Sequence, residues 1–209
     1  MRSDHKNDLK GLQLPLVEEF FSIQGEGWHT GKAAYFIRLG GCDVGCSWCD
    51  SRFAWDPELH PLIKTDEIIE RVISLGADSV VVTGGEPLMW NLDYLCSGLK
   101  RNNICTFLET SGTCPLSGQW NWICLSPKKN VPPSEALCHI ADELKVIIEN
   151  KDDFHWAEKY RKLVGRSCKL FLQPEWSRFE NIIPEIVDYV RKNPVWRISL
   201  QVHKFMHIP

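Results

Sequence analysis

Residues 41–50 read Gly-Cys-Asp-Val-Gly-Cys-Ser-Trp-Cys-Asp, and this segment decides the fold. It places Cys42, Cys46 and Cys49 within one short loop, at the spacing Cys-x-x-x-Cys-x-x-Cys. Thiolates are soft ligands that suit zinc and iron–sulfur centres. Three closely spaced thiolates leave one iron of a 4Fe–4S cluster without a protein ligand, so a small molecule can chelate that iron. We therefore predict that these three cysteines are the ligands of an open cluster.

A structural zinc site is the alternative for this loop, with Asp50, Asp43 or a distant histidine as the fourth ligand. Structural zinc sites usually show two paired ligand spacings, and the sequence holds no second Cys-x-x-Cys pair. This favours the cluster. The six other cysteines are scattered, mostly in apolar stretches, and each is expected to be a small core residue rather than a disulfide partner. They are Cys96, Cys105, Cys114, Cys124, Cys138 and Cys168.

The composition predicts one globular domain over residues 1–209. Hydrophobic residues make up 44% of the chain and charged residues 24%, which is ordinary for a soluble protein of this class. The net charge of −3 provides no basic field, so we expect no direct binding of nucleic acid. No apolar run approaches the ~20 residues of a membrane helix, and no signal peptide is apparent. We expect a cytoplasmic protein without membrane contact, with residues 1–12 flexible.

Short β-branched or aromatic runs alternate with helix-like segments along the chain. The predicted strands are 17–22, 33–39, 79–83, 106–109, 122–125, 143–148, 169–173 and 197–201. The predicted helices are 65–75, 91–100, 152–163 and 179–192, with Thr65 as the cap of the first and Gly76 just past its end. This alternation indicates an α/β fold with a mostly parallel sheet. Because eight βα units need about 250 residues, any barrel here must be partial.

A second motif, Thr83-Gly84-Gly85-Glu86-Pro87, follows the valine-rich strand 79–83. Parallel folds place their functional loops at the carboxyl ends of strands, where the cluster loop also lies. Glycines let backbone approach a ligand, and a carboxylate can accept a hydrogen bond from an ammonium group. The turn alone would be an ordinary strand-to-helix connection. Together with the cluster loop, it points to a cofactor site.

These two motifs resemble those of the radical S-adenosylmethionine superfamily. From about residue 17 to the last residue, an ordered series of segments is also similar to the 7-carboxy-7-deazaguanine synthase family. Besides the two motifs, the series comprises Gln24-Gly25-Glu26-Gly27, Phe36-Ile37-Arg38, Glu109-Thr110-Ser111-Gly112-Thr113, Ser126-Pro127-Lys128, Gln173-Pro174, Gln201-Val202-His203-Lys204 and Ile208-Pro209. The resemblance implies an incomplete TIM-like barrel, a modified form of the superfamily's six-unit barrel.

The resemblance also implies a reaction. Members of this family are carbon–nitrogen lyases of queuosine and 7-deazapurine biosynthesis. Their substrate is 6-carboxy-5,6,7,8-tetrahydropterin, and their product is 7-carboxy-7-deazaguanine, formed with loss of ammonia. The implied cofactors are a 4Fe–4S cluster, S-adenosylmethionine and Mg²⁺. The radical comes from the cofactor, so no side chain is predicted to be catalytic.

The family's roles carry over residue by residue. Residues expected near S-adenosylmethionine are Glu26, Trp48, Cys49, Asp50, Gly85, Glu86, Ser126, Pro127, Lys128, Gln173, Pro174, Glu175 and Trp176. Residues expected around the pterin are Ile23, Gln24, Gly25, Arg38, Thr83, Glu109, His203 and Pro209. Mg²⁺ is assigned to Ser51, where relatives often have threonine, and Asp50 is the competing ligand.

The chemistry of these residues suits a flat anionic heterocycle. The guanidinium of Arg38 could pair with a carboxylate, and Glu109 could accept from the N–H groups of a guanidine-like pterin edge. Gln24 can offer hydrogen bonds to the same ring. The alternative for Arg38 is a surface ion pair. The alternative for Pro209, whose carboxylate could fold back into the site, is a frayed tail.

Two other functions are open to such a sequence. Another small radical S-adenosylmethionine enzyme, such as a glycyl-radical activase, shares the three-cysteine loop. Activases usually lack the Gln-Gly-Glu-Gly start and the His-Lys-to-Pro ending. A zinc-bound or cluster-bound binding module would leave the motifs after the strand ends without a joint purpose. The resemblance further implies a homodimer and an electron donor such as flavodoxin or ferredoxin.

Overall fold

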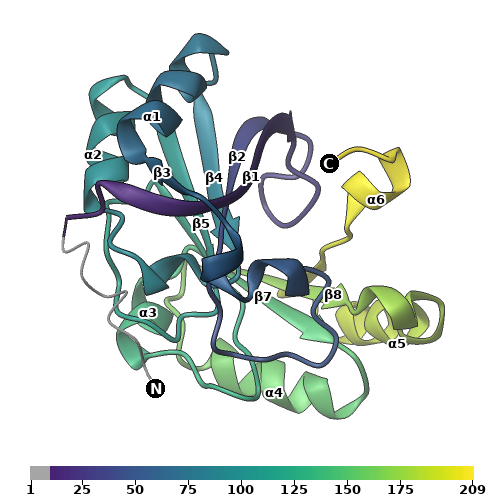
Figure 1. The fold of residues 1–209 in the computed structure, drawn as a ribbon. Coiled ribbons are helices and arrows are strands. Elements are labelled where there is room, and N and C mark those ends of the chain that lie inside the picture. Colours follow the sequence, from purple (N-terminus) through teal and green to yellow (C-terminus); the bar gives the residue numbers. More distant parts are fainter. Residues whose placement is uncertain (1–9) are drawn as a thin grey trace.

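The structure is a computed structural model that describes residues 10–209. Within these residues, nine strands form one sheet in the order β3-β1-β2-β4-β5-β6-β7-β8-β9 (Figure 1). The strands are β1 (Gln13–Ile23), β2 (Ala33–Leu39), β3 (Leu62–Lys64), β4 (Ser79–Gly84), β5 (Cys105–Thr110), β6 (Trp122–Leu125), β7 (Glu143–Ile148), β8 (Lys169–Pro174) and β9 (Trp196–Ile198). From β2 to β9 they run parallel, whereas β1 is antiparallel to both neighbours. The sheet is open, which confirms the prediction of a partial, mostly parallel barrel.

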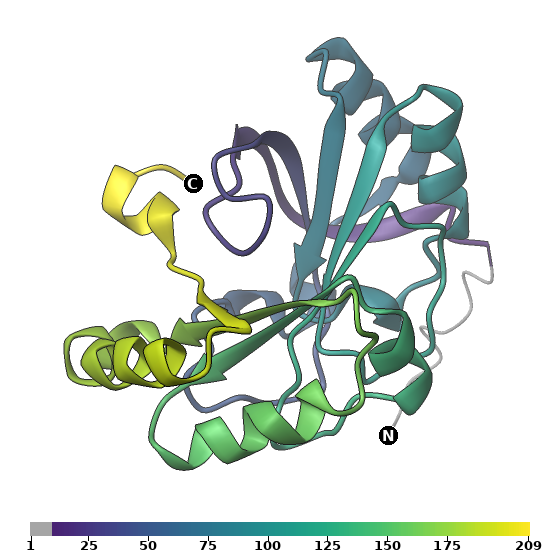
Figure 2. The same ribbon diagram turned by 180° about the vertical axis from the view of Figure 1, so that it is seen from behind.

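Helices cover the outer face of this curved sheet. They are α1 (Thr65–Ser74), α2 (Asp93–Arg101), α3 (Glu135–Ile140), α4 (Asp152–Arg161), α5 (Phe179–Lys192) and α6 (Val202–Met206). Figures 1 and 2 show α1 to α5 around the outside, while α6 turns back toward the loop between β1 and β2. The backbone N–H of Val202 donates to the carbonyl of Gly25 at 2.9 Å. The C-terminal segment therefore closes over the inner side of the sheet.

The hydrophobic core between helices and sheet explains why the long elements were predictable. In one part of this core, Ile68 of α1 and Leu95 of α2 pack with Val80 of β4, and all three are completely buried. In the other, Ala157 of α4 and Ile186 of α5 pack on Leu144, Val146 and Leu172. A helix that buries one stripe shows an apolar period of 3.6 residues. Strands buried on both faces appear as continuous apolar runs.

Several predicted boundaries are confirmed, and the shortest elements were missed. The predicted ranges of β2, β6, β7 and α5 match the structure, and Gly76 follows α1 with a φ of +65°. Three-residue β3 and six-residue α3 are too short to show a period. The last strand was predicted to reach Gln201, but it ends at Ile198. Thr65 is not the cap of α1, because its hydroxyl donates to the carbonyl of Gly11 at 2.6 Å.

The remaining expectations concern the chain ends and the scattered cysteines. Residues 1–9 of the segment predicted to be flexible lie outside the described residues, whereas the carbonyl of Leu12 accepts from the N–H of Thr65 at 2.9 Å. In the part of the chain that is described, no helix is both long and apolar enough to cross a membrane. Of the six other cysteines, Cys96, Cys124, Cys138 and Cys168 are buried, and Cys105 and Cys114 are half-buried.

The turn after β4 lies directly against the cluster loop. The N–H of Gly85 donates to the carbonyl of Leu39 at 3.0 Å, and the N–H of Glu86 donates to the carbonyl of Gly41 at 2.7 Å. A Cβ atom on Gly84 would overlap the backbone of Leu39, and Gly84 has a φ of +151°. A Cβ atom on Gly85 would overlap the carbonyl of Gly41 and lie 2.7 Å from the Cβ of Cys42. Two glycines are needed here because backbone packs on backbone.

Replacing Gly85→Ala should therefore displace the cluster loop. We expect a loss of about 1–3 kcal/mol in the free energy of unfolding, because the added methyl group meets backbone atoms that cannot move freely. Urea unfolding of the cluster-free protein measures this loss. Gly165→Ala is the matched control, since its nearest neighbour would be the carbonyl oxygen of His139 at 3.5 Å. Equal stability of the two variants would contradict the close-approach explanation.

Candidate active site

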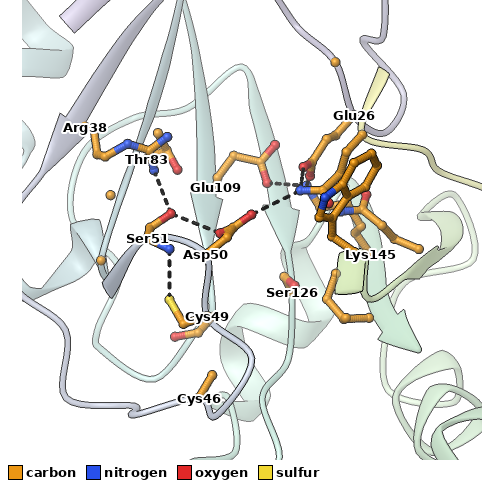
Figure 3. Close-up of a pocket in the computed structure, with 18 of the residues that line it drawn as sticks. Glu26, Arg38, Cys46, Cys49, Asp50, Ser51, Thr83, Glu109, Ser126 and Lys145 are labelled. Carbon is orange, nitrogen blue, oxygen red and sulfur yellow. Dashed lines mark hydrogen bonds and ion pairs between the residues drawn. The ribbon is translucent and has the colours of Figure 1, made fainter. Parts of the chain in front are cut away.

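A cavity opens at the carboxyl ends of the parallel strands, where both motifs meet. Its empty volume is about 1460 Å³, including space open to solvent. Each of six neighbouring parallel strands brings a polar side chain to it: Arg38 with β2, Thr83 with β4, Glu109 with β5, Ser126 after β6, Lys145 with β7 and Gln173 with β8. Figure 3 shows Arg38 and Thr83 on one side, Glu26 and Lys145 on the other, and Glu109 and Asp50 between them.

The cavity brings together nearly all of the residues that the sequence predicted. The three cluster cysteines, Ser51 and every residue expected around the pterin line it. Every residue expected near S-adenosylmethionine also lines it, except Glu86 and Pro127. These residues come from segments between Ile23 and Pro209, so the fold gathers them from almost the whole chain.

Glu86 does not line the cavity, and a contact between its carboxylate and S-adenosylmethionine stays a prediction. Its side chain is 1% exposed. Its oxygens accept from the Thr110 hydroxyl at 2.6 Å, from the N–H of Ser111 at 2.8 Å, and from the N–H of Leu88 at 3.1 Å. Both oxygens of this carboxylate are therefore engaged within the protein. It ties β4 to the end of β5, and the backbone of Gly84 and Gly85 lines the cavity instead.

The cluster loop is held from both sides. The N–H of Cys42 donates to the carbonyl of Trp55 at 3.0 Å, and the side-chain amide of Asn130 donates to the carbonyls of Val44 and Gly45 at 3.1 and 2.9 Å. Cys42, Cys46 and Cys49 are half-buried and face the same cavity. Burial raises the pKa of the Cys42 and Cys46 thiols. Metal binding is what would deprotonate them.

The cysteines of the loop are not gathered as the ligands of a closed zinc site would be. Among residues 10–209, no group of three or more His, Cys, Asp or Glu side chains is arranged to hold a metal ion. A zinc ion needs its ligands to converge within about 2.0–2.3 Å of one point. A 4Fe–4S cube takes its thiolates on separate irons, so they stand farther apart. His203 and His207 do have a His-x-x-x-His spacing, but His207 is exposed and only His203 lines the cavity.

Arg38 forms a surface ion pair and also lines the cavity. Its Nε lies 2.7 Å from Oε1 of Glu18, whose side chain is largely exposed. One terminal nitrogen donates to Oγ of Ser51 at 3.4 Å. The two alternatives for this arginine therefore do not compete, because Glu18 fixes one edge of the guanidinium and leaves the other toward the cavity.

Ser51 and Asp50 provide a poor cage for Mg²⁺ by themselves. Oγ of Ser51 donates to Oδ1 of Asp50 at 3.1 Å. Oδ2 of Asp50 accepts from Lys204 at 3.0 Å and from Gln201 at 3.3 Å. Burial would raise the pKa of Asp50, but these donors hold it below its ordinary value. A magnesium ion here would need substrate oxygens and water for most of its six ligands.

Lys145 is the site residue that sequence reasoning missed. Its side chain is 5% exposed, and its Nζ lies 2.6 Å from Oε2 of Glu26 and 2.9 Å from Oε2 of Glu109. Burial would raise the pKa of Glu26, but the charge of Lys145 lowers it to about 2. The signal was present in the sequence, since Lys145 interrupts the apolar run of strand 143–148 and a buried lysine requires a partner.

Glu143 lies two residues before Lys145 on the same face of β7, one layer deeper. Its Oε2 accepts from the N–H of Trp28 at 3.1 Å and from Nε1 of Trp122 at 3.0 Å. Its Oε1 has no hydrogen-bond partner among the described residues. The rings of Trp28 and Trp122 stack with centroids 6.2 Å apart. Burial therefore raises the pKa of Glu143 to about 7, although Lys145 opposes the shift.

Comparison with known proteins identifies relatives of similar length. The model of the radical SAM superfamily matches residues 36–122. A 7-carboxy-7-deazaguanine synthase from Flavobacterium psychrophilum is 56% identical over 200 residues, which is 96% of this chain and 95% of that protein. Another from Synechocystis is 43% identical over 202 residues, with 97% of both chains covered. The crystal structure of QueE from Escherichia coli superposes with a TM-score of 0.83 at 28% identity, covering 95% of this chain and all of that one.

The buried carboxyl group of Glu143 predicts a pH dependence of stability. Its folded pKa lies above the unfolded value of 4.5, so the folded state holds the extra proton and stability falls as pH rises from 4.5 to about 7. Glu143→Gln cannot ionise and should escape this loss. We expect the variant to gain about 3 kcal/mol relative to the wild type between pH 5 and pH 8.

Urea unfolding at several pH values measures this difference. Glu180→Gln, an exposed position in the first turn of α5, is the matched control and should follow the wild type at every pH. Parallel stability curves for Glu143→Gln and the wild type would contradict the assignment of a buried neutral carboxyl group.

Proposed function

Because the chain belongs to the 7-carboxy-7-deazaguanine synthase family of the radical S-adenosylmethionine superfamily, we propose that it converts 6-carboxy-5,6,7,8-tetrahydropterin to 7-carboxy-7-deazaguanine with loss of ammonia. It is a radical enzyme of the carbon–nitrogen lyase type. The reaction lies on the route to queuosine and other 7-deazapurines. The glycyl-radical activase alternative has no observation in its favour.

One observation carries this proposal: the same cavity presents three cysteine thiols and, at separate positions, Arg38 on β2 and Glu109 on β5. When bound and reduced, a 4Fe–4S cluster would supply one electron that cleaves S-adenosylmethionine to methionine and a 5′-deoxyadenosyl radical. Cys42, Cys46 and Cys49 would hold this group. The surrounding residues hold the substrate beside the radical and keep water out.

The residues expected near S-adenosylmethionine lie around the loop that carries Cys49. Nζ of Lys128 donates to Oγ of Ser126 at 2.6 Å and lies 5.3 Å from the ring centroid of Trp48. Burial lowers the pKa of Lys128, although the Cys46 thiolate would raise it. We infer that Trp48, Ser126 and Lys128 form one wall of the S-adenosylmethionine site. Gln173, whose Oε1 accepts from Ser199 at 2.6 Å, belongs to the opposite wall.

The protein groups expected around the pterin carry opposite charges at the two ends of the pterin site. We infer that the free edge of Arg38 receives the substrate's carboxylate. Glu109 and Gln24 receive the N–H groups of the guanidine-like edge. Gln24 donates to Oε1 of Glu109 at 3.4 Å, so the two already share one hydrogen-bonded unit. A flat ring with an anion at one end and N–H donors at the other fits this distribution.

The C-terminal segment would cover the bound pterin. A Cβ atom on Gly25 would overlap the ring of His203, so glycine is required for α6 to pack there. Burial lowers the pKa of His203, which keeps its imidazole neutral near pH 7. The carbonyl oxygen of Pro209 accepts from Oγ of Ser22 at 3.2 Å. We propose that this segment excludes water from the reacting carbon.

Further features remain proposals on the basis of the resemblance. They are Mg²⁺ at Ser51, one catalytic domain over residues 1–209, a cytoplasmic location, a homodimer, and an electron donor such as flavodoxin or ferredoxin. The half-buried cysteines that face the cavity support the donor, because the cluster must be reachable by an electron. Light scattering would test the dimer, and reduction of the reconstituted cluster by purified flavodoxin would test the donor.

Anaerobic assay of the reconstituted protein tests the proposed reaction. With dithionite, S-adenosylmethionine and carboxytetrahydropterin, we expect 7-carboxy-7-deazaguanine and ammonia to rise together above the substrate-free background. Cys49→Ala should lose both the cluster absorbance and the product, because one iron loses its ligand. Cys96→Ala, at a core position in α2, should keep both. A background level of 7-carboxy-7-deazaguanine with reconstituted wild-type protein and substrate would contradict the proposal.

The same assay contains the test for Mg²⁺. Omitting the ion should lower product formation by the wild type, and Ser51→Ala should reduce that dependence. Equal dependence on Mg²⁺ in both proteins would remove Ser51 from the metal site.

Arg38→Ala should raise KM for the pterin at least about ten-fold, because a charge-assisted hydrogen bond to a carboxylate contributes ~1.5–3 kcal/mol. Cleavage of S-adenosylmethionine without substrate should persist. Glu18→Gln is the control, since it breaks only the ion pair on the outer edge of the guanidinium. Its KM should change less than about three-fold. An unchanged KM in Arg38→Ala would leave this arginine with only its surface role.

A further inference from the structure

We propose that Lys145 is a positioning residue that keeps the carboxylates of Glu26 and Glu109 ionised and aligned, and so links the pterin side of the cavity to the S-adenosylmethionine side. The inference rests on the proposed function and adds to it. Lys145 is not required for the fold to form a strand at β7, where an apolar side chain would serve the core. Its presence needs a functional explanation.

The geometry places one ammonium group between two carboxylates that come from different elements. Glu26 belongs to the loop after β1, and Glu109 belongs to β5. Both ion pairs are short, at 2.6 and 2.9 Å, and the lysine side chain is 5% exposed. Such charge-assisted contacts in a water-poor environment are directional and strong. They fix where both carboxylates stand before any ligand binds.

The second oxygen of each carboxylate contacts a different part of the site. Oε1 of Glu26 accepts from Nε2 of Gln201 at 2.9 Å, and the same amide reaches Asp50 in the cluster loop. Oε1 of Glu109 lies 3.4 Å from Nε2 of Gln24 on the pterin side. The ion pairs of Lys145 with Glu26 and Glu109 connect these two parts of the site (Figure 3). A change at Lys145 therefore reaches both ligand positions.

The electrostatic surroundings show what would happen without the ammonium group. The titratable groups that face Lys145 are Glu26, Glu109 from β5, Cys124 from β6, Glu143 from β7, Lys128 from the loop after β6 and His203 from α6. Without Lys145, two nearby carboxylates would share a space with a low dielectric constant. Like charges in such a place favour uptake of a proton by one member of the pair. A protonated carboxyl group loses part of its capacity to accept from the pterin's N–H edge.

Lys145→Met should therefore show a specific pH signature relative to the wild type. In the wild type the carboxylate of Glu26, with a pKa of about 2, stays ionised from about pH 6 to 9, so it adds no pH dependence to pterin affinity. In the variant the pair of carboxylates should hold a proton near neutral pH. Affinity should then be low at pH 7 and should recover as rising pH removes that proton.

The experiment titrates the cluster-free protein with 6-carboxypterin, a fluorescent and stable analogue of the substrate. Lys145→Met should bind it at least about ten-fold more weakly than the wild type at pH 7, and within about three-fold at pH 9. Lys145→Arg, which keeps the charge, should lose less affinity and show no recovery with pH. Lys169→Met, a lysine at the start of β8 outside the cavity lining, is the matched control and should behave as the wild type. Equilibrium dialysis should show weaker binding of S-adenosylmethionine to Lys145→Met as well.

A second comparison tests the inference through stability, for the case that Lys145→Met folds poorly. Lys145→Met with Glu109→Gln removes one of the two facing carboxylates, so its melting temperature at pH 8 should exceed that of Lys145→Met alone. A double variant no more stable than the single one would overturn the inference. So would a loss of pterin affinity that does not recover with pH, which is the behaviour of a merely structural residue. Failure of the wild type to bind 6-carboxypterin at any pH would instead overturn the proposed function.

Discussion

The buried ammonium group of Lys145 is the constraint on which the interior of this protein depends. A charge inside a sheet is tolerated only when opposite charges meet it, because removing it from water costs several kcal/mol. Glu26 and Glu109 meet that need at 2.6 and 2.9 Å. The loop after β1 must therefore reach across to β7, and this crossing forms a wall of the cavity. Gln201 extends the network from Glu26 to Asp50 in the cluster loop, so the C-terminal segment is held by the same charge.

A second constraint brings the two motifs into contact. Because β2 and β4 are parallel neighbours, Leu39 pairs with Gly84 in register, and the loops that follow both strands leave the sheet at one point. Backbone contact between those loops then leaves no room for side chains at Gly84 and Gly85. The two glycines of this turn are thus a packing requirement, whatever ligand the turn meets. Glu86 completes the arrangement by bonding to Thr110 and Ser111 at the end of β5.

Prediction from the sequence succeeded where one residue pattern implied one structure. Continuous apolar runs specified β2, β6 and β7, the apolar stripe of α5 specified its full length, and the motifs brought the predicted residues to one cavity. It failed where the deciding contact is distant in sequence. The motif does not say on which side of the turn Glu86 points, and one lysine inside a strand is equally compatible with an exposed edge. The end of β9 depended on where Gly25 would hold Val202, which no local pattern encodes.

The charges of the cavity argue that position, rather than net charge, selects the ligand. Glu26, Asp50 and Glu109 face it together with Arg38, Lys128 and Lys145, so anionic and cationic groups nearly balance. A balanced cavity exerts little long-range attraction on a simple anion or cation. Two groups remain only weakly engaged: the inner edge of Arg38, which lies 3.4 Å from Ser51, and Oε1 of Glu109, which lies 3.4 Å from Gln24. The cavity then selects a rigid molecule whose own carboxylate and N–H edge match both places at once. A molecule that matches only one place leaves the protein group at the other place desolvated and unpaired.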